Sequence, residues 1–344
     1  MTRSENGPAD TPQTVTPRRI AIACQGGGSH TAFTAGVLQT LLDAHDPARH
    51  EIVGLSGTSG GAVCAVLAWD GMRRGGAALA CDALDGFWAD NAATGTMDRL
   101  ANAWTVWASA LSTVIATPPV SPYDTFGAVI GRDRFRQLLD RRVEFDTIGV
   151  DTDGKLPMLL VGAVDVLSGE FAAFNSRRDR ITADVIAASA AVPGLFRAVV
   201  VGDGTYWDGQ FSQNPPVREL LDVQPDEIWV IQVNPRRREA VPRTTVEIAD
   251  RRNELAGNLS LHQELYFIAQ VNRLIADDLL RPTSRYTPTV VRVIELTRTP
   301  MSRSLGATSK LNRDPAFIRQ LIDHGRQRAE EFLTTPDIGS VNLA

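Results

Sequence analysis

Apolar residues follow two patterns in the first part of the chain. Residues 18–25, "RRIAIACQ", form a short continuous apolar run, which is typical of a buried strand, and residues 32–44 carry apolar side chains at helical spacing. Residues 50–57, "HEIVGLSG", repeat the strand pattern, and residues 62–72 repeat the helical pattern with small and apolar side chains. Strand, helix, strand and helix in this order predict an α/β fold built on a parallel sheet.

The middle and the end of the chain predict further strands and helices. "KLPMLLVGAVDVLSGEFAAFNS" reads as two strands joined through Ser168 and Gly169, and "RAVVVGDGTYWDGQ" reads as a hairpin that turns at Asp203-Gly204. "ITADVIAASAAVPGLF" predicts a helix that begins after Thr182 as N-cap and ends at Pro193-Gly194. The remaining predictions are strands in "DEIWVIQVNP" and "TVVRVIELTR" and helices over residues 245–280 and 313–333.

The simplest domain organisation is one domain over residues 18–335. Residues 1–17 are polar and rich in proline and threonine, without the apolar segment of a secretory signal, so we expect a disordered N-terminal tail. Residues 336–344 are expected to form a C-terminal tail. The chain shows no internal repeat and no low-complexity stretch.

Composition and charge are those of an ordinary globular protein. Hydrophobic residues make up 43% of the chain, charged residues 22%, and the net charge is −5. This acidic balance argues against a nucleic-acid partner, and the run Arg236 to Arg238 reads as a solvated loop. The three cysteines, Cys24, Cys64 and Cys81, predict buried reduced thiols and a cytoplasmic location, and they form no metal-binding pattern.

Residues 100–123 contain no charged side chain, which is unusual in this chain. Polar residues dilute the segment and prolines end it, so a buried helix or a cap over an apolar pocket is preferred to a membrane span. As a cap, Trp104 and Trp107 would line an acyl pocket or contact a membrane surface. Peripheral membrane contact is therefore a hypothesis, and the sequence indicates no oligomeric state.

"CQGGGSHTAF", residues 24–33, places three glycines between a strand and a helix. Such a loop can bind a phosphate, stabilise an oxyanion or form a turn. A dinucleotide site requires a third fingerprint glycine where Thr31 stands, and no acid ends the second strand. A nucleotide-binding P-loop requires a following Gly-Lys-Ser/Thr, which is also missing.

"GTSGG", residues 57–61, fits the G-x-S-x-G pattern with Ser59 at its centre. A nucleophile on a strand-to-helix turn has a strained backbone, and neighbours two positions away crowd its Cβ. Glycine at Gly57 and Gly61 would remove that crowding. The alternative is an ordinary glycine-rich turn.

A serine nucleophile needs a base, and the sequence leaves two possibilities open. None of four histidines (His45, His50, His262 and His324) follows a strand, where a Ser-His-Asp esterase would carry its histidine. Asp208 stands at the end of a predicted strand, and shielding from water would raise its pKa and make it a better base.

Three blocks in the order "QGGGSHTAFTAGVL", "GTSGGAVCAV" and "WDGQFSQNPP" resemble the patatin-like phospholipases, and "ASAAVPGLFRAV", "PRTTVEIADRRNEL" and "SLGATSKLNRD" resemble a bacterial intracellular branch of that family. The resemblance implies a three-layer α/β/α fold with a mainly parallel central sheet. It implies Ser59 as nucleophile, Asp208 as base, and an oxyanion hole from the amides of Gly26, Gly27 and Gly28. The implied reaction is hydrolysis of lipid or other carboxylic esters through an acyl-enzyme, without metal or organic cofactor.

Two positions depart from the family pattern. His30 stands where the family usually carries arginine or lysine, so support of the oxyanion by positive charge would depend on pH. Gln210 stands where glycine or alanine is usual, and its side chain would narrow the site. A catalytically weak or inactive lipid-binding regulator with the same fold is therefore an alternative to the hydrolase.

Overall fold

The computed structural model describes residues 16–96, 98–103, 121–124, 126–281, 285–297 and 305–335, with no description of side chains 126–130. The described strands are β1 (Arg18–Cys24), β2 (His50–Thr58), β3 (Met158–Asp165), β4 (Phe171–Asn175), β5 (Val199–Val201), β6 (Gly204–Asp208), β7 (Glu227–Gln232) and β8 (Val290–Glu295). The described α-helices are α1 (Ala32–Asp43), α2 (Gly60–Gly75), α3 (Ala77–Asn91), α5 (Phe126–Asp140), α6 (Ala183–Ser189), α7 (Thr245–Ala276) and α8 (Pro315–Thr334).

The described strands all join one sheet of mixed, mostly parallel character. Following the hydrogen-bonded pairs gives the order β5-β6-β3-β2-β1-β7-β8, and β4 pairs with β3. The five strands from β3 through β2, β1 and β7 to β8 are parallel, whereas β4, β5 and β6 form the antiparallel part. The predicted α/β fold with helices around a mainly parallel sheet is confirmed.

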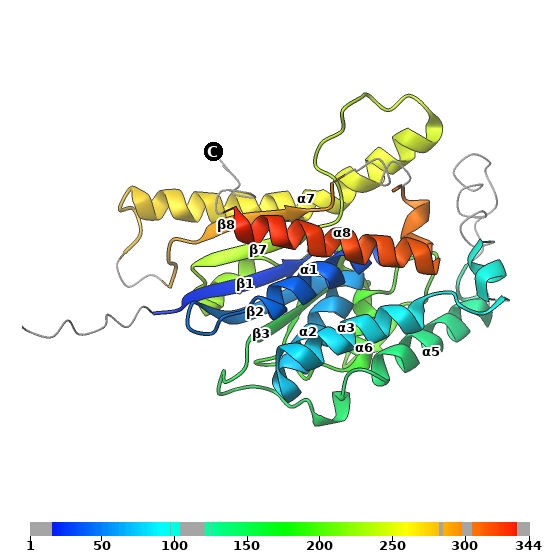
Figure 1. The fold of residues 1–344 in the computed structure, drawn as a ribbon, viewed down its shortest axis with the longest axis horizontal. Helices are drawn as coiled ribbons and strands as arrows, with labels where there is room; N and C mark the ends of the chain where they lie inside the picture. Colours follow the sequence, from blue (N-terminus) through cyan, green and yellow to red (C-terminus); the bar gives the residue numbers. More distant parts are fainter. Residues whose placement is uncertain are drawn as a thin grey trace, which may run out of the picture.

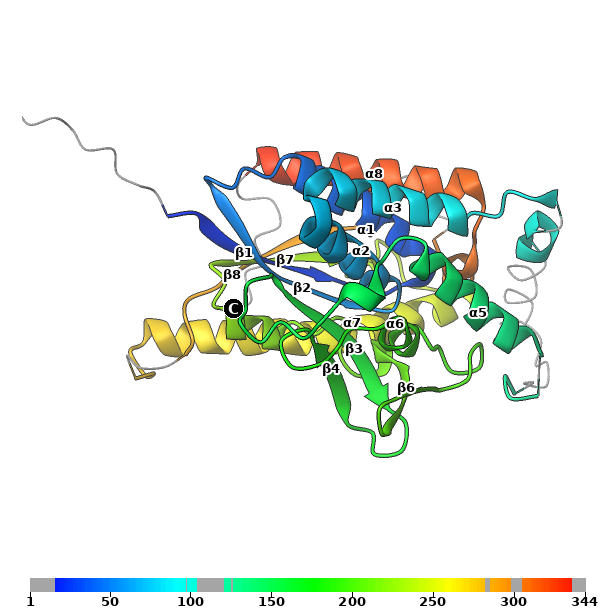
Figure 2. The ribbon, with the colours of Figure 1, turned by 90° about the horizontal axis from the view of Figure 1, so that it is seen from below.

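Helices cover both faces of the sheet (Figures 1 and 2). Alternate residues of β1 point to opposite sides: Ile20 and Ile22 join a large core with α1, α2, α3 and α8, while Ala21 and Ala23 join a second core with α7. This alternation follows from the two-residue period of a strand. Because both faces are covered, β1 is apolar throughout instead of alternating with polar residues.

Two local predictions need correction. The hairpin turn is Gly202-Asp203, because Gly204 already pairs with Val201 and Gly202 has the positive φ of 58° that such a turn requires. The helix capped by Thr182 ends at Ser189 instead of Pro193, and the chain that follows offers the carbonyl of Ala191 to the amide of Asp208.

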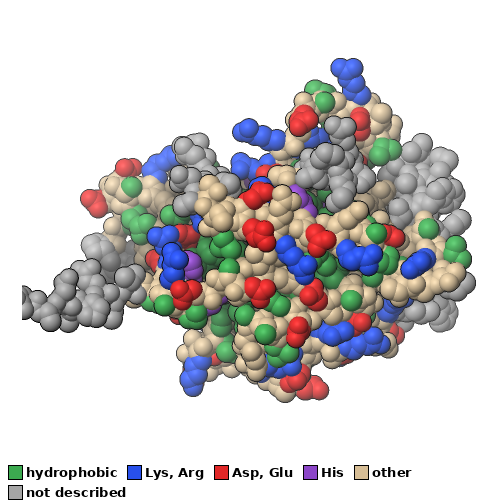
Figure 3. Space-filling view, in the orientation of Figure 1, with side chains coloured by type: hydrophobic (Ala, Val, Ile, Leu, Met, Phe, Trp, Pro, Cys, Tyr) green, Lys and Arg blue, Asp and Glu red, His purple; other side chains and the backbone are tan. Residues whose placement is uncertain are grey.

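Two helices, α3 and α5, occupy ranges for which no element is predicted from the pattern. The tails over residues 1–15 and 336–344 and the uncharged residues 104–120, with Trp104 and Trp107, lie outside the described residues. No helix in the described ranges is both long and apolar enough to cross a bilayer. On the face drawn in Figure 3, positive and negative side chains are interspersed over most of the surface.

Candidate active site

Ser59 occupies a strained turn between a strand and a helix. β2 ends at Thr58 and α2 begins at Gly60, so Ser59 alone makes the connection, with φ 55° and ψ −129°. A non-glycine residue with positive φ is uncommon and costs free energy. A Cβ on Gly57 would lie 2.5 Å from the carbonyl oxygen of Gly61, and one on Gly61 would lie 2.2 Å from that of Cys24. The two glycines therefore permit the turn, as the sequence pattern predicts.

β3 brings Ser59 and Asp208 together. Thr58, the last residue of β2, pairs with Gly162, and Asp208, the last residue of β6, pairs with the next residue, Ala163. β4 pairs with both of these β3 residues and so occupies the opposite edge. Because a strand has only two edges, β2 and β6 share one edge of β3 in succession. The residue that follows β2, Ser59, therefore meets the end of β6.

A buried hydroxyl fixes the backbone of the turn. The amide of Ser59 donates to Oγ of Ser189 at 2.9 Å, and that hydroxyl donates to the carbonyl of Gly162 at 2.6 Å. Ser189 is the last residue of α6, so α6 and β3 together hold Ser59 in place. Only 8% of Ser59 is exposed, and its exposed part lies in a pocket.

The carboxyl group of Asp208 is almost fully buried. Its Oδ1 accepts the amide of Gln210 at 2.8 Å, while Oδ2 has no hydrogen-bond partner among the described residues. Burial raises the pKa of Asp208 to about 7, and the amide of Gln210, the side chain of Ser59 and the charge of Lys310 oppose this rise. Ser59 interacts with Asp208 without a regular hydrogen bond, and Oδ2 is left free to take a proton.

The backbone amides of the three glycines in the loop after β1 differ in their hydrogen bonding. The amide of Gly26 donates to Oδ1 of Asn214 at 2.8 Å and is therefore engaged within the protein. Gly27 precedes the short 3₁₀ turn η1 (Gly28–Thr31), and neither its amide nor that of Gly28 has a partner in the described part of the chain. Gly28 lines the pocket next to Ser59. Free amides for an oxyanion are thus those of Gly27 and Gly28.

His30 contacts the C-terminal part of the chain instead of the pocket. It is 4% exposed, its Nε2 lies 2.8 Å from Oγ of Ser309, and its ring meets the edge of Phe317 at 6.2 Å. The contact with Ser309 joins η1 to the 3₁₀ turn η6 (Thr308–Leu311), and the contact with Phe317 joins η1 to α8. Neither His30 nor Gln210 is among the residues that line the pocket, so neither narrows it.

The other four histidines lie away from Ser59. His324 packs its ring on Phe33 at 5.6 Å, and His50 packs on Trp229 at 5.9 Å. None of the described residues that line the pocket is a histidine, so His45 and His262 also lie outside it. The Ser-His-Asp arrangement therefore has no support from the geometry.

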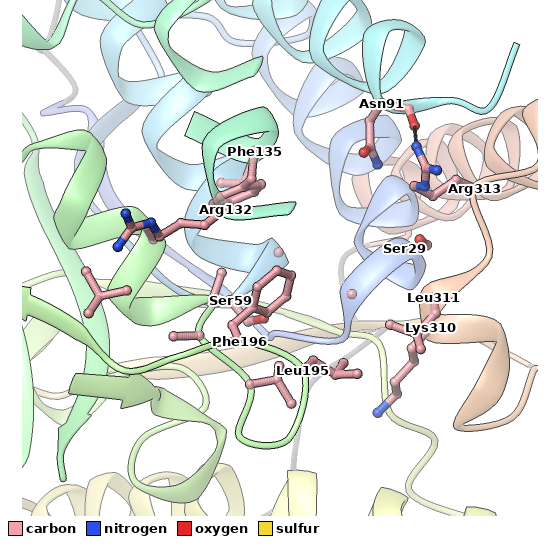
Figure 4. A pocket seen from close by; sticks show the side chains of 18 of the residues that line it. Ser29, Ser59, Asn91, Arg132, Phe135, Leu195, Phe196, Lys310, Leu311 and Arg313 are labelled. Carbon is pink, nitrogen blue, oxygen red and sulfur yellow. Dashed lines mark hydrogen bonds between the residues drawn. The ribbon is translucent and has the colours of Figure 1, made fainter. Parts of the chain in front are cut away.

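An apolar pocket of about 310 Å³ opens above Ser59 (Figure 4). Phe196 lies beside the serine, and Lys310 and Leu311 lie on the opposite side. The volume of this pocket and its apolar lining are typical of a small-molecule site that binds an apolar chain. The apolar lining residues are Val63, Phe87, Trp88, Phe135, Ala187, Ala190, Ala191, Val192, Leu195, Phe196, Val199 and Leu311.

The described residues at the two ends of the uncharged segment 100–123 contact the wall of this pocket. Asn102 accepts the amide of Arg313 at 2.8 Å, and the carbonyls of Pro122 and Tyr123 accept the guanidinium of Arg197. Both arginines line the pocket. The described residues at both ends of the uncharged segment therefore lie beside the pocket.

The described residues include no group of three or more His, Cys, Asp or Glu side chains that could hold a metal ion. The three cysteines are free thiols, of which Cys24 and Cys64 are buried and Cys81 is only partly so. Burial raises the pKa of Cys64 to about 12, which keeps that thiol protonated and unreactive.

Three residues near Ser59 are not predicted from the sequence: Ser189, Asn214 and Lys310. Ser189 and Asn214 contact the turn and the glycine loop from more than a hundred positions away in the chain. The three residues lie in stretches that resemble the family: Asn214 in "WDGQFSQNPP", Ser189 in "ASAAVPGLFRAV" and Lys310 in "SLGATSKLNRD". Single polar residues otherwise carry no pattern that distinguishes them from surface residues.

Comparison with known proteins gives a family match over more than half of the chain. Residues 22–221 match the model of the patatin-like phospholipase family. This range contains the glycine loop, Ser59 and Asp208. A search of curated proteins found no match.

Similar solved structures include bacterial proteins from Legionella pneumophila and Pseudomonas aeruginosa. VipD from Legionella pneumophila aligns with a TM-score of 0.45 and 14% identity over 93% of this chain and 67% of that chain. ExoU in complex with SpcU from Pseudomonas aeruginosa aligns with a TM-score of 0.30 and 14% identity over 91% and 52%. A second structure, of the type III effector protein ExoU, aligns with a TM-score of 0.29 and 15% identity over 91% of this chain and 54% of that chain. The present chain thus spans about half the length of the ExoU chains.

Proposed function

The chain belongs to the patatin-like phospholipase family, whose members are typically lipid acyl hydrolases, and from this premise we propose that it hydrolyses carboxylic esters of lipids through an acyl-enzyme on Ser59. The observation that carries the proposal is the meeting of Ser59, on its strained turn, with the buried Asp208 on one edge of β3.

In the first half of the reaction, Oγ of Ser59 attacks the ester carbonyl carbon while Asp208 takes the hydroxyl proton. The tetrahedral intermediate then collapses, the alcohol leaves with the proton from Asp208, and the acyl group remains on Ser59. In the second half, Asp208 takes a proton from water, the hydroxyl attacks the acyl-enzyme, and the acid leaves as Ser59 regains its proton. A pKa near 7 suits Asp208 to both directions of proton transfer.

The negative oxygen of the tetrahedral intermediate needs donors that are already in place. The amides of Gly27 and Gly28 lie in the loop after β1 and have no partner among the described residues, and we assign the oxyanion hole to them. The amide of Gly60 is a third candidate, because it stands at the start of α2 next to the nucleophile and has no partner among the residues that the structure describes. Gly26 shapes the loop through Asn214.

The pocket supports an apolar acyl group as the part of the substrate bound next to Ser59. Its lining is mainly aliphatic and aromatic, and burying a methylene contributes about 0.8 kcal/mol. Turnover of a panel of phospholipid, lysophospholipid and neutral lipid esters would show which class of alcohol the substrate carries.

The proposed function is tested by turnover of p-nitrophenyl esters of several chain lengths. Ser59→Ala and Asp208→Asn are each expected to lower kcat by about 10³-fold or more, since each removes one member of the reacting pair. Circular dichroism should show both variants folded. Asp203→Asn, an exposed aspartate in the turn before β6, is the matched control and should keep full activity.

Labelling by a fluorophosphonate gives an independent readout of the nucleophile. The wild-type protein should be labelled at Ser59, and Ser59→Ala should not. Full turnover in Ser59→Ala would overturn the mechanism, and loss of turnover in His324→Ala would favour a histidine base instead. A wild-type protein that binds fatty acid but neither turns over nor labels would be a lipid-binding protein.

A further inference from the structure

Lys310 is one of only two lysines in a chain that otherwise uses arginine for its positive side chains. The other, Lys155, has a side chain that is 79% exposed and pairs with Asp153. Lys310 is instead partly buried on η6 and lines the same pocket as Ser59. A lysine loses its charge more readily than arginine when buried, so the residue type matters at this place.

The ammonium group of Lys310 is held by neutral partners. Its Nζ donates to Oδ1 of Asn234 at 2.9 Å and to Oδ1 of Asn253 at 2.6 Å. No carboxylate forms an ion pair with Lys310 within the ranges that the structure describes. Amide oxygens stabilise the ammonium without cancelling its charge, and a low-dielectric surrounding lets that charge act on its neighbours.

The turn that carries Lys310 packs directly on the glycine loop. The carbonyl oxygen of Lys310 lies 2.4 Å from the position that a Cβ on Gly28 would take. The hydrogen bond between His30 and Ser309 fixes this packing from the other side. The backbone of Lys310 is therefore held against the glycine loop, and the charged residue beside this loop belongs to η6, whereas the family motif would place it at His30.

We propose that Lys310 is a positioning residue of the active site, whose ammonium stabilises the negative charge that Asp208 must carry before it accepts the proton of Ser59. The proposal rests on the proposed function. The charge of Lys310 lowers the pKa of Asp208, against the effect of burial. Reciprocally, Asp208 raises the pKa of Lys310, which burial lowers to about 8.

The other charged groups that face this pair come from α7 and η1. Glu254 and Asp250 on α7 raise the pKa of Lys310 as Asp208 does. Glu254 also binds Arg238 at 2.8 Å, and Asp250 accepts the amide of Ala307 at 2.7 Å. His30 of η1 is the titratable neighbour of η6 on the opposite side.

The first test is the pH dependence of kcat/KM. In Lys310→Met, the acidic limb of the kcat/KM profile should move to higher pH by about one unit, because the positive charge that helps to keep Asp208 ionised is removed. Activity at pH 6.5 should fall about tenfold, and wild type and variant should converge above pH 9, where wild-type Lys310 is itself mostly neutral. Lys310→Arg keeps the charge and should retain the wild-type limb. Lys155→Met is the control for loss of a lysine and should match wild type.

The second test needs no turnover. With lysine labelled by ¹³C at Cε, nuclear magnetic resonance should show two lysine side-chain signals, which Lys155→Arg assigns. Linkage requires the coupling between Lys310 and Asp208 to be reciprocal. In Asp208→Asn, the titration of Lys310 should therefore move to lower pH, while that of Lys155 stays unchanged.

An unchanged Lys310 titration in Asp208→Asn would overturn the inference, and so would a Lys310→Met profile that is lowered evenly at every pH. The second pattern would indicate a purely structural role. Failure of the proposed function looks different: the wild-type protein would show neither turnover nor fluorophosphonate labelling, while the coupled titration of Lys310 and Asp208 would persist.

Discussion

The carboxyl group of Asp208 lies in surroundings that favour its protonated form, and this affects stability as well as catalysis. Its folded pKa of about 7 exceeds the ordinary aspartate value of 3.8, so between these values the folded state holds a proton that the unfolded state has lost. The stability that this proton contributes is fully present below pH 4 and is lost as pH rises through 7.

Asp208→Asn should therefore become more stable relative to wild type as pH rises. We expect nearly equal Tm values at pH 4 and a Tm higher in the variant by about 2 °C or more at pH 8, since an uncharged side chain avoids the cost of a buried carboxylate. Thermal melts followed by circular dichroism measure this. Asp203→Asn should show no such trend, and a Tm difference for Asp208→Asn that is constant with pH would contradict the buried carboxyl.

The backbone of Ser59 makes a second prediction at the residue scale. A residue at φ 55° and ψ −129° costs about 1–3 kcal/mol, and glycine relieves this strain at an entropic cost of about 0.5–1 kcal/mol. Ser59→Gly should thus be at least as stable as Ser59→Ala, by up to about 2 kcal/mol in urea unfolding, while both are inactive. If Ser59→Gly were instead about 1 kcal/mol less stable than Ser59→Ala, as glycine is relative to alanine within an ordinary helix, the result would contradict a strained turn.

At the scale of single residues, the sequence predicts those that belong to a local pattern. Ser59 with its flanking glycines is predicted from five consecutive residues, and Asp208 is predicted from its place at the end of a strand. Ser189 and Lys310 lie in stretches that resemble the family, but no pattern within those stretches singles them out, because both reach the site through tertiary contacts. His30 shows the converse: its motif position suggested a role at the oxyanion, and its side chain instead binds Ser309.

Among the elements, β3 determines whether the proposed nucleophile and base meet. Gly162 lies at the crossing point, and a Cβ there would be 2.5 Å from Oγ1 of Thr58 and 2.8 Å from the carbonyl of Gln213. Gly162→Ala should displace the end of β2, lower kcat at least tenfold and destabilise the fold by about 1–3 kcal/mol.

Gly149→Ala is the matched control for this prediction, because a Cβ on Gly149 meets nothing within 4 Å. Ester turnover and urea unfolding of the two variants should differ clearly. Gly162→Ala with wild-type kcat would show that the crossing of β2 and β6 on β3 has no part in positioning Ser59.

The elements that the sequence predicts best have the strongest periodicity. β1, β2, α1 and α2 agree with their predicted ranges to within a few residues, because each has a continuous or helical apolar pattern that burial requires. In α3, Ala80, Leu84 and Phe87 repeat at helical spacing, but small residues between them weaken the contrast between faces. The exact position of the hairpin turn depends on the register between β5 and β6. The sequence Gly202-Asp203-Gly204 allows the turn at either of two overlapping pairs, and the sequence alone does not decide between them.

For the whole molecule, the order of strands is the part that sequence patterns leave open. The parallel start of the sheet follows from alternating strands and helices. The antiparallel pairing of β6 with β3 beyond the end of β2 depends on contacts across about forty residues of chain and on the packing of α6. This pairing also creates the pocket, because the segment between α6 and β5 forms one of its walls.

The pocket as a whole predicts selectivity for acyl chain length. Ala190 lines it but is only partly buried, so Ala190→Phe can fill pocket volume without overpacking the core. We expect kcat/KM for dodecanoate and longer p-nitrophenyl esters to fall about tenfold or more while that for butyrate changes little, since each methylene denied burial costs about 0.8 kcal/mol. Ala48→Phe, at an exposed loop position, should leave the ratio unchanged. An equal loss for short and long esters in Ala190→Phe would mean that the acyl chain binds outside this pocket, and the assignment of substrate part to cavity would then be wrong.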